Sequence, residues 1–316
     1  MTENVIRSLD DLPPEARESV LAIGNFDGVH LGHQRILRTA RALAARDRCA
    51  VVAMTFEPPP DQVLRPDDKR ERLTLAEQKA ELLRQAGADW VVFLRADRKL
   101  LGTPAEEFVR RIIVDRIAPG HIVEGQNFFF GRGRQGNVTL LAEMGRSHGF
   151  EVRVVDPCQM DLDGESVRIS STLIRRLLRE GRVAHASRAL GRPFALSGRV
   201  VWGHGRGRTI QYPTANLGDT RQIHPADGVY ACRAELGNEL WAAAVSVGAS
   251  PTFGGDDAAV EAFILDAEGD FYRQRMTLHF LQRLREQRRF EDREALRAQI
   301  TRDVQRVREI CASDSA

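Results

Sequence analysis

Hydrophobic positions divide the chain into two halves with different patterns. In the first half, short apolar runs rich in β-branched residues alternate with longer segments whose apolar residues recur every three or four positions. The short runs are typical of strands buried in a parallel sheet, and the longer segments are typical of amphipathic helices. The predicted strands are Val20–Ile23, Ala50–Thr55, Trp90–Leu94, His121–Val123 and Glu151–Val155, and the predicted helices are Gln34–Ala45, Leu75–Gln85, Pro104–Val114 and Val138–Gly145. Such alternation predicts an α/β domain with helices on both faces of its sheet.

The pattern changes after Gly191-Arg192-Pro193, where strand-like runs follow one another without helices between them. Glycine, proline and asparagine separate these runs, which favours a small antiparallel barrel. The predicted strands are Leu196–Trp202, Gly228–Leu236, Leu240–Val247, Val260–Leu265 and Met276–Leu281, and a long charged helix follows over Arg293–Cys311. The domain boundary is expected between Arg182 and Phe194. We set it so that residues 1–184 form the first domain and residues 185–316 the second.

The bulk composition argues against a nucleic-acid or membrane protein. The 316 residues contain 46 Lys and Arg against 44 Asp and Glu, so a net charge of +2 leaves no global field that attracts polyanions. The four cysteines lie far apart without a Cys-x-x-Cys pair, and the N-terminus lacks the apolar core of a signal peptide. We therefore expect a cytoplasmic protein that acts on small molecules, as a monomer or weak homo-oligomer.

The stretch Gly24–His33, Gly-Asn-Phe-Asp-Gly-Val-His-Leu-Gly-His, carries the first chemical indication. It lies where a predicted strand leads into a helix, and a helix N-terminus offers unpaired N–H groups and partial positive charge to a phosphate. Glycines allow close approach of the backbone, and His30 and His33 can donate hydrogen bonds to phosphate oxygens. Taken alone, the stretch is equally compatible with a glycine-rich turn that carries two surface histidines.

Three further clusters follow other elements of the first half. A proline loop, Thr55–Pro60, ends the second predicted strand, and a Gly-Arg-rich loop over Gly125–Gly136 ends the fourth. Arg168-Ile-Ser-Ser-Thr172 and Arg175 place hydroxyls and arginines at a helix start. The default interpretation of Ser170 or Ser171 is a plain N-cap, because serine is a preferred capping residue.

In the second half, Gly205–Asn216 is the strongest pattern, with the run Pro213-Thr-Ala-Asn at its end. Alone it is compatible with a hairpin loop and a proline turn. Glu261 lies in a predicted strand, and its ordinary interpretation is a charged residue on the solvent face.

Together these motifs resemble one family, the bifunctional bacterial riboflavin kinase/FMN adenylyltransferases, also called FAD synthetases. The resemblance runs in order from Gly24 to the terminal helix. It implies an N-terminal nucleotidyltransferase domain with a Rossmann-like parallel sheet, and a C-terminal antiparallel β-barrel kinase domain with a terminal helix. In the nucleotidyltransferase domain, His30 and His33 match catalytic positions. The matching ATP-binding positions are Gly24, Phe26, Asp27, Asn127, Arg168, Ser170, Ser171, Thr172 and Arg175.

The resemblance also implies the parts of a kinase site. Glu261 matches the catalytic base, and Thr214 and Asn216 match the residues that hold Mg²⁺ and the ATP phosphates. The ATP- and flavin-binding positions are Gly205, Arg208, Thr214 and Asn216. The implied function is phosphorylation of riboflavin to FMN by ATP, followed by adenylylation of FMN to FAD with release of pyrophosphate.

Two departures from the family pattern keep narrower interpretations open. Pro59 stands where the family usually has histidine, so we expect weaker adenylyl transfer or flavin binding. Gln211 replaces a usual glycine before the Tyr212-Pro-Thr-Ala-Asn run. The alternatives are a riboflavin kinase with weakened or lost adenylyltransferase activity, and a non-catalytic flavin-binding paralogue.

An unrelated enzyme class is suggested by Gly131-Arg-Gly-Arg-Gln-Gly136, which satisfies the Gly-x-Gly-x-x-Gly fingerprint of dinucleotide-binding oxidoreductases, with Asp156 20 residues further on. The context argues against it, because the motif follows three phenylalanines late in the domain rather than the first strand. A shift in NAD(P)H fluorescence would be needed to support it. A Walker-type kinase is excluded, since no Gly-x-x-x-x-Gly-Lys occurs.

Overall fold

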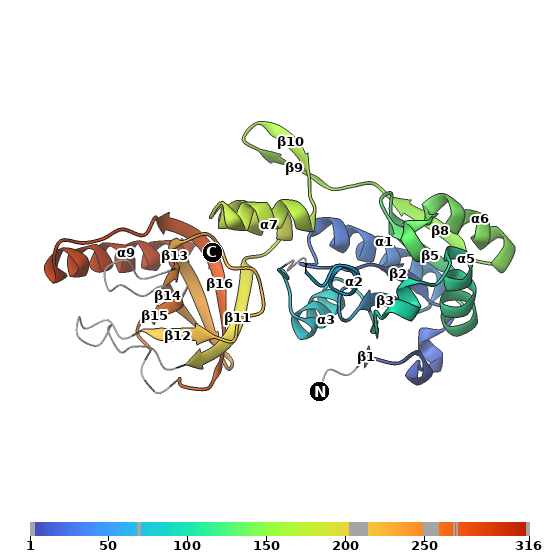
Figure 1. Cartoon of the computed structure of the whole chain (residues 1–316), viewed down its shortest axis with the longest axis horizontal. Coiled ribbons are helices and arrows are strands. Elements are labelled where there is room, and N and C mark those ends of the chain that lie inside the picture. The colour runs from blue at the N-terminus through green and yellow to red at the C-terminus, as the bar shows by residue number, and fades with distance from the viewer. Residues whose placement is uncertain are drawn as a thin grey trace. The chain divides into compact units, whose positions relative to one another are not determined.

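The protein is described by a computed structural model covering residues 4–67, 71–201, 214–248, 259–267, 269 and 271–313 (Figure 1). Its contacts cluster into two compact units. The first consists of residues up to 70 together with Thr74–Ile169, and the second of Glu71–Leu73 together with residues from Ser170 onward.

The first unit is built on a six-stranded sheet in the order β1-β4-β3-β2-β5-β8, and every pairing within it is parallel. Its strands are β1 (Val5–Ile6), β2 (Val20–Ile23), β3 (Val51–Phe56), β4 (Trp90–Leu94), β5 (His121–Gly125) and β8 (Glu151–Val155). The predicted parallel sheet is confirmed. Strand β1 was not among the five predicted strands, because its two residues are too few to give a periodic pattern.

Alternate residues of the central strands pack into two hydrophobic cores, one on each face of the sheet. Val20, Ala22 and Val51 pack with Leu37 and Leu83 of the helices α1 and α3. On the opposite face, Leu21, Ile23 and Val52 join a second cluster with residues from α5 to α6. The bounds are α1 (Leu31–Asp47), α3 (Ala76–Gln85), α5 (Ala105–Phe108) and α6 (Val138–His148). The ribbon shows these two helical layers enclosing the sheet, as two-sided burial of parallel strands requires (Figure 1).

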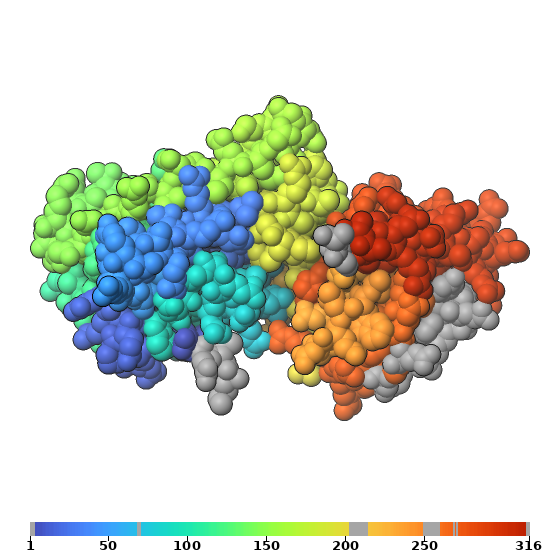
Figure 2. All heavy atoms as spheres, turned by 180° about the vertical axis from the view of Figure 1, so that it is seen from behind, coloured from blue at the N-terminus to red at the C-terminus, as the bar shows by residue number. Residues whose placement is uncertain are grey.

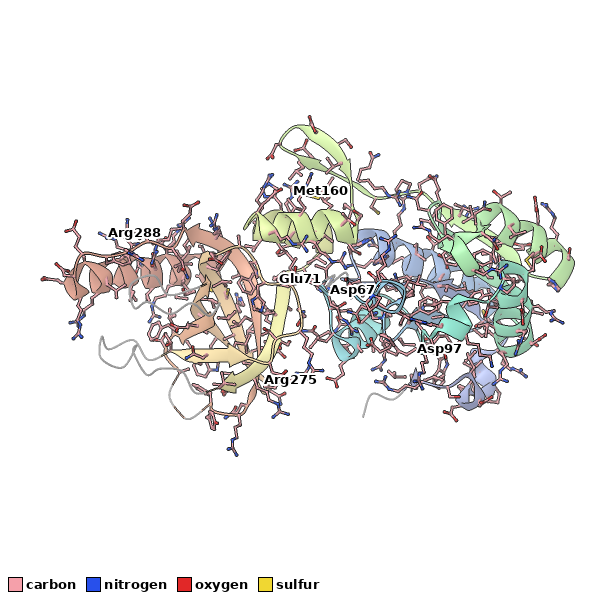
Figure 3. All side chains as sticks on the ribbon, viewed as in Figure 1. Asp67, Glu71, Asp97, Met160, Arg275 and Arg288 are labelled. Atoms are coloured by element: carbon pink, nitrogen blue, oxygen red, sulfur yellow. The ribbon has the colours of Figure 1, made fainter. Side chains whose placement is uncertain are left out.

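Several local features differ in detail from the predicted helices. The helix expected over Pro104–Val114 is a short α5 that continues as a π-helix over Val109–Ile117. Asp97, labelled in Figure 3, caps the short helix α4 by accepting a hydrogen bond from the Leu100 N–H at 2.8 Å. The remaining elements are α2 (Pro60–Leu64), α4 (Arg98–Leu101), the antiparallel pair β6 (Phe129–Phe130) and β7 (Gly136–Asn137), and the hairpin β9 (Gln159–Leu162) and β10 (Glu165–Arg168).

The second unit contains a closed antiparallel barrel in the order β11-β12-β15-β14-β13-β16, preceded by two helices. Its elements are α7 (Ser171–Arg179), α8 (Val183–Leu190), β11 (Phe194–Val201), β12 (Ala215–Gly218), β13 (Gly228–Leu236), β14 (Glu239–Gly248), β15 (Ala259–Ile264), β16 (Arg275–Arg285) and α9 (Arg293–Ser313). The predicted barrel is confirmed. Strand β12 was not among the predicted strands, because its four residues follow a turn-like sequence.

The terminal helix α9 packs against the outside of the barrel, and in Figure 2 its dark red atoms lie against the orange strands. Val307 and Cys311 of α9 cluster with Ala231 and with the small side chains that strand β14 turns outward. The Arg285 guanidinium donates to both carboxylate oxygens of Asp303, at 2.8–3.2 Å. Asp303 is buried, so this ion pair fastens α9 to the end of β16.

Helices α7 and α8 belong to the second unit. The predicted boundary between residues 184 and 185 separates two functional domains, and it stays a prediction.

Candidate active sites

The first candidate site lies at the switch point of the parallel sheet, where β2 has β3 on one side and β5 on the other. All four residues of β2 pair with β3, whereas only Val20 and Leu21 pair with β5. Beyond them, the N–H of Ile23 donates to the Glu124 carboxylate at 2.5 Å instead of to a backbone carbonyl. Ligands of such folds bind in the crevice beyond the strand ends at a switch point.

Glu124 is an unusual residue for this position, because its side chain is buried. Burial raises the pKa of Glu124 well above its ordinary value, while the N–H groups of Ile23 and Gly125 oppose that rise. The carboxyl therefore serves as a substitute acceptor where the backbone ladder between β2 and β5 ends.

The turn between β2 and α1 has an uncommon backbone. Phe26, Gly28 and Val29 have φ angles of 46°, 85° and 40°, and a β-branched residue such as valine rarely adopts a positive φ. Gly24, at the end of β2, donates its N–H to the Met54 carbonyl at 3.0 Å. Phe26 is buried beneath the turn. Backbone of this kind costs on the order of 1–3 kcal/mol per residue and persists only where the surroundings hold it.

The turn brings His30 and His33 together at the start of α1. His30 is the N-cap residue, and its Nδ1 accepts the His33 N–H at 3.4 Å. The two rings stack with centroids 3.6 Å apart, and the Phe26 ring meets His33 edge-on at 5.2 Å. Because the His30 Nδ1 is an acceptor, a neutral His30 carries its proton on Nε2 and can donate from there. The predicted glycine-rich turn at a helix N-terminus is thus present, with both rings fixed by mutual packing.

Asn127 and Arg168, from the loop after β5 and the end of β10, also lie together. With its amide oxygen turned toward Arg168, Asn127 accepts hydrogen bonds from both terminal guanidinium nitrogens, one at 2.9 Å. A carboxamide of this kind fixes the plane of the guanidinium, the group that binds phosphates best in a bidentate manner.

The remaining residues that the sequence predicts to bind ATP lie at the start of α7 and within it, in the second unit. Ser170 is its N-cap and accepts the Leu173 N–H at 3.2 Å, so the plain capping role considered from the sequence is present. Ser171 and Thr172 form the first turn. The Nε of Arg175 donates to the carbonyl of Glu71 at 2.8 Å, and Arg179 pairs with the Glu71 carboxylate at 3.0 Å (Glu71 is labelled in Figure 3).

The second candidate site is a row of polar side chains across three neighbouring barrel strands. Asn216 of β12 lies directly opposite Glu261 of β15, and Glu261 lies directly opposite Ser246 of β14. Opposed residues of a ladder point to the same face, so these three side chains form a continuous polar row. All three are partly exposed, while Val245, Val247 and Ala262 beside them point into the barrel.

Gln287, in the segment after β16, extends this row. Its amide nitrogen donates to the Ser246 hydroxyl at 3.0 Å and to the Val247 carbonyl at 2.9 Å. Thr214 is half-buried and lies two residues before Asn216. Gly205, Arg208 and Gln211 lie outside the described residues.

Sequence reasoning missed three residues that these contacts single out: Thr74, which contacts Asp27, together with Ser246 and Gln287. Alternation along the predicted strand Leu240–Val247 gives the face on which Ser246 lies, but not its neighbours. Thr74 precedes a predicted helix and had the appearance of an ordinary loop residue.

Comparisons with known proteins match each half of the chain to a known family. Residues 12–173 match the family model described as FAD synthetase, and residues 190–311 match the one described as riboflavin kinase. The bifunctional riboflavin kinase/FMN adenylyltransferase of Pseudomonas fluorescens is 38% identical over 309 residues, which is 98% of each chain. Its counterpart from Escherichia coli K12 is 36% identical over 307 residues, covering 96% of this chain and 97% of that one.

A solved structure from Streptococcus pneumoniae, described as a macrolide-efflux protein, shares the fold over nearly the whole length. It is 32% identical with a TM-score of 0.85, and the alignment covers 96% of this chain and 98% of that one. In the part of this chain that the structure describes, no helix has the length and apolar character needed to cross a bilayer.

The two family-model matches, one on the α/β unit and one on the barrel, define a two-part nucleotide-dependent transferase. The chain belongs to the bifunctional riboflavin kinase/FMN adenylyltransferase family.

Proposed function

We propose that this enzyme phosphorylates riboflavin to FMN in its barrel and joins FMN to AMP in its α/β domain, giving FAD and pyrophosphate. Riboflavin, FMN and ATP are the substrates of the family. The observation that carries the proposal is that both regions occur in one chain along almost the full length of bifunctional relatives. The presence of His30, His33, Asn216 and Glu261 disfavours a non-catalytic paralogue.

In the kinase reaction, the acceptor is the primary hydroxyl of the ribityl chain, which is a poor nucleophile until its proton is removed. Glu261 takes that proton, the ribityl oxygen forms a bond to the γ-phosphorus of ATP, and the bond to ADP breaks. Glu261 is partly exposed in the polar row, which supports this role because a catalytic base must be accessible to the substrate. A positioned base typically contributes ~10²–10⁴-fold to such a step.

Thr214 and Asn216 are the residues that would hold Mg²⁺. Hydroxyl and amide oxygens are ligands that suit this hard cation, which usually keeps waters and substrate phosphates as its other ligands. Both side chains are partly exposed, and Asn216 lies next to Glu261 in the ladder. When bound, the ion would neutralise charge on the ATP phosphates, held beside the side chain of Glu261.

In the adenylyltransferase reaction, the nucleophile is the FMN phosphate, which is already an anion and needs no general base. One of its oxygens forms a bond to the α-phosphorus of ATP, and the bond to pyrophosphate breaks. The work left to the protein is alignment and neutralisation of charge. The α1 N-terminus, His30, His33 and the Asn127–Arg168 pair supply donors of this kind on one unit. From the family resemblance we also assign Ser170, Ser171, Thr172 and Arg175 to ATP binding in this reaction.

We also propose that the enzyme works in the cytoplasm as a monomer or weak homo-oligomer, with no nucleic-acid partner. Light scattering across a range of protein concentrations tests the oligomeric state. A stable large oligomer would contradict it.

Flavin chromatography tests the assigned reactions directly. Pure protein with riboflavin, ATP and Mg²⁺ should give FMN and then FAD, with one ADP formed per riboflavin consumed and one pyrophosphate per FAD. A parallel run that starts from FMN should give FAD and pyrophosphate without ADP. No conversion in either run would contradict the proposed function, and FMN without FAD would leave the kinase alone.

A further inference from the structure

The turn between β2 and α1 leads to the candidate histidines and contains residues with unfavourable backbone angles. Phe26 and Val29 have φ angles of 46° and 40°, which lie in the left-handed region that non-glycine residues avoid. Left to itself, this stretch would relax toward ordinary backbone angles. Such strain is found where the surrounding structure holds it in place, and it is frequent at functional sites.

Thr74 comes from a distant segment of the chain, just before α3, and makes three hydrogen bonds to this turn. Its backbone N–H and its hydroxyl both donate to Oδ1 of Asp27, at 3.1 Å each. The hydroxyl oxygen in turn accepts the N–H of Gly28 at 3.1 Å. The side chain is buried at 6% exposure, so water competes little for these bonds. The threonine hydroxyl thus acts as donor and acceptor at once, and joins the side chain of Asp27 to the backbone of Gly28.

Thr74 lies just before helix α3, which packs into the core. Leu75, the next residue, is the N-cap of α3, and its N–H donates to the Gln78 side chain at 3.0 Å. Helix α3 is anchored in the core by Ala80 and Leu83. Thr74 therefore holds the turn against a fixed helix.

The turn transmits this position to the histidines. Gln34 donates its amide to the carbonyl of Val29 at 2.9 Å, and its N–H to the carbonyl of His30 at 3.0 Å. The backbone from Gly28 to His30 is consequently held at both ends, by Thr74 at Gly28 and by Gln34 of α1 at Val29 and His30.

We propose that Thr74 is a positioning residue of the adenylyltransferase site, and this inference rests on the proposed function of that site. It acts through Asp27 and Gly28, holding the strained turn in the conformation that presents the His30 ring and the α1 N-terminus to the phosphates. Asp27 accordingly serves as the acceptor that fixes the turn. Misplacement of such groups by about 1 Å can cost on the order of 100-fold in rate.

The test compares Thr74→Val, which keeps the shape and removes the hydroxyl, with Thr74→Ser, which keeps the hydroxyl. Thr74→Val should lower kcat/KM for FMN adenylylation by about 10- to 100-fold, while Thr74→Ser stays within about threefold of wild type. Riboflavin phosphorylation by the same chain should be unchanged in both. Thr39→Val is the matched control, because Thr39 of α1 donates its hydroxyl only within its own helix, to Arg35.

A second variant tests whether Thr74 acts through Asp27, while the unchanged riboflavin phosphorylation guards against a general folding defect. Asp27→Asn keeps the shape and weakens both bonds from Thr74, so it should lower adenylylation in the same direction. Because the two residues act as one unit, adding Thr74→Val to Asp27→Asn should cost less than the product of the two single effects. Hydrogen exchange of the Gly28 amide should accelerate in Thr74→Val, since that amide loses its acceptor.

The outcomes separate this inference from the proposed function. If wild type binds ATP but forms no FAD, the proposed adenylyltransferase function fails, and weaker ATP binding by Thr74→Val would still support the positioning role. If Thr74→Val matches wild type in both ATP affinity and adenylylation, the inference is wrong. Independent, multiplicative effects of the two substitutions would also overturn it.

Discussion

The two halves of this enzyme present their chemistry in opposite ways. In the α/β unit, the candidate residues lie on turns and loops beyond the strand ends, and the histidines depend on a strained turn. In the barrel, Asn216, Glu261 and Ser246 lie within regular strands and are brought side by side by ladder register, with Gln287 as a further contact of Ser246. One site is therefore held by contacts between distant segments, and the other by backbone pairing.

This difference has a consequence for how each site fails. A site on a turn is sensitive to residues that touch no substrate, because they hold the turn. A site on paired strands keeps its geometry until the barrel itself opens, since a register shift would turn every side chain to the other face. Substitutions around the first site should thus change rates, and those around the second should first change stability.

The largest effect is expected for Glu261→Gln. The amide keeps the shape and hydrogen-bonding length of the side chain but cannot accept the ribityl proton. The kcat for riboflavin phosphorylation should fall by ~10²–10⁴-fold, with little change in the KM for ATP. Steady-state kinetics with chromatographic detection of FMN provides the measurement. A kcat within twofold of wild type would remove Glu261 from the reaction.

Next in size is the loss of stability when α9 is detached from the barrel. Asp303→Ala leaves the Arg285 guanidinium without its partner in a mostly buried place, and such a loss typically costs about 3–5 kcal/mol. Denaturant unfolding followed by circular dichroism measures it. Glu309→Ala is the control, because Glu309 pairs with Arg306 on the exposed face of the same helix. Equal effects of the two substitutions would contradict the anchoring role.

Pro59→His should change the first site by a smaller amount. Pro59 precedes α2 directly, and a histidine there restores the ring nitrogen that the family usually offers. We expect adenylylation to increase about threefold, the equivalent of an ordinary hydrogen bond of ~0.5–1.5 kcal/mol. Pro60→His, one residue further on, should give no such gain. If Pro59→His left both the rate and the flavin KM unchanged, the expectation that Pro59 weakens this site would be wrong.

The smallest effect concerns pH. Burial raises the pKa of Glu124 in the folded state, so folding favours the protonated form. The resulting stability is fully present below the ordinary pKa of 4.5 and is lost as the pH rises through the raised value. The melting temperature of wild type should therefore decline more than that of Glu124→Gln as the pH rises above 4.5. Parallel declines of the two proteins would contradict the role given to Glu124.

Much of the fold could be predicted from local pattern. The strands of both units and helices such as α1 and α9 follow from apolar periodicity, because burial on one or two faces imposes that period. The turn at Gly24–His33 could be predicted because strand, glycines and helix start are contiguous. Strand β12 could not, since its four residues show no period of their own.

Contacts between distant segments left no pattern in the sequence. The bond from Thr74 to Asp27 joins residues 47 positions apart, and the bond from Gln287 to Ser246 joins residues 41 apart. Glu124 likewise had the appearance of one more residue at a strand end. Its burial follows from the divergence of β2 and β5, which depends on sheet order rather than on local composition.

The most direct test of the central claim, two separable sites in one chain, uses a pair of variants and one chromatogram of flavin products. Glu261→Gln should form FAD from FMN at the wild-type rate but almost no FMN from riboflavin. His33→Ala should form FMN from riboflavin at the wild-type rate but almost no FAD from either flavin. Loss of both activities in either variant would contradict the account, because it would mean that the two reactions share a site.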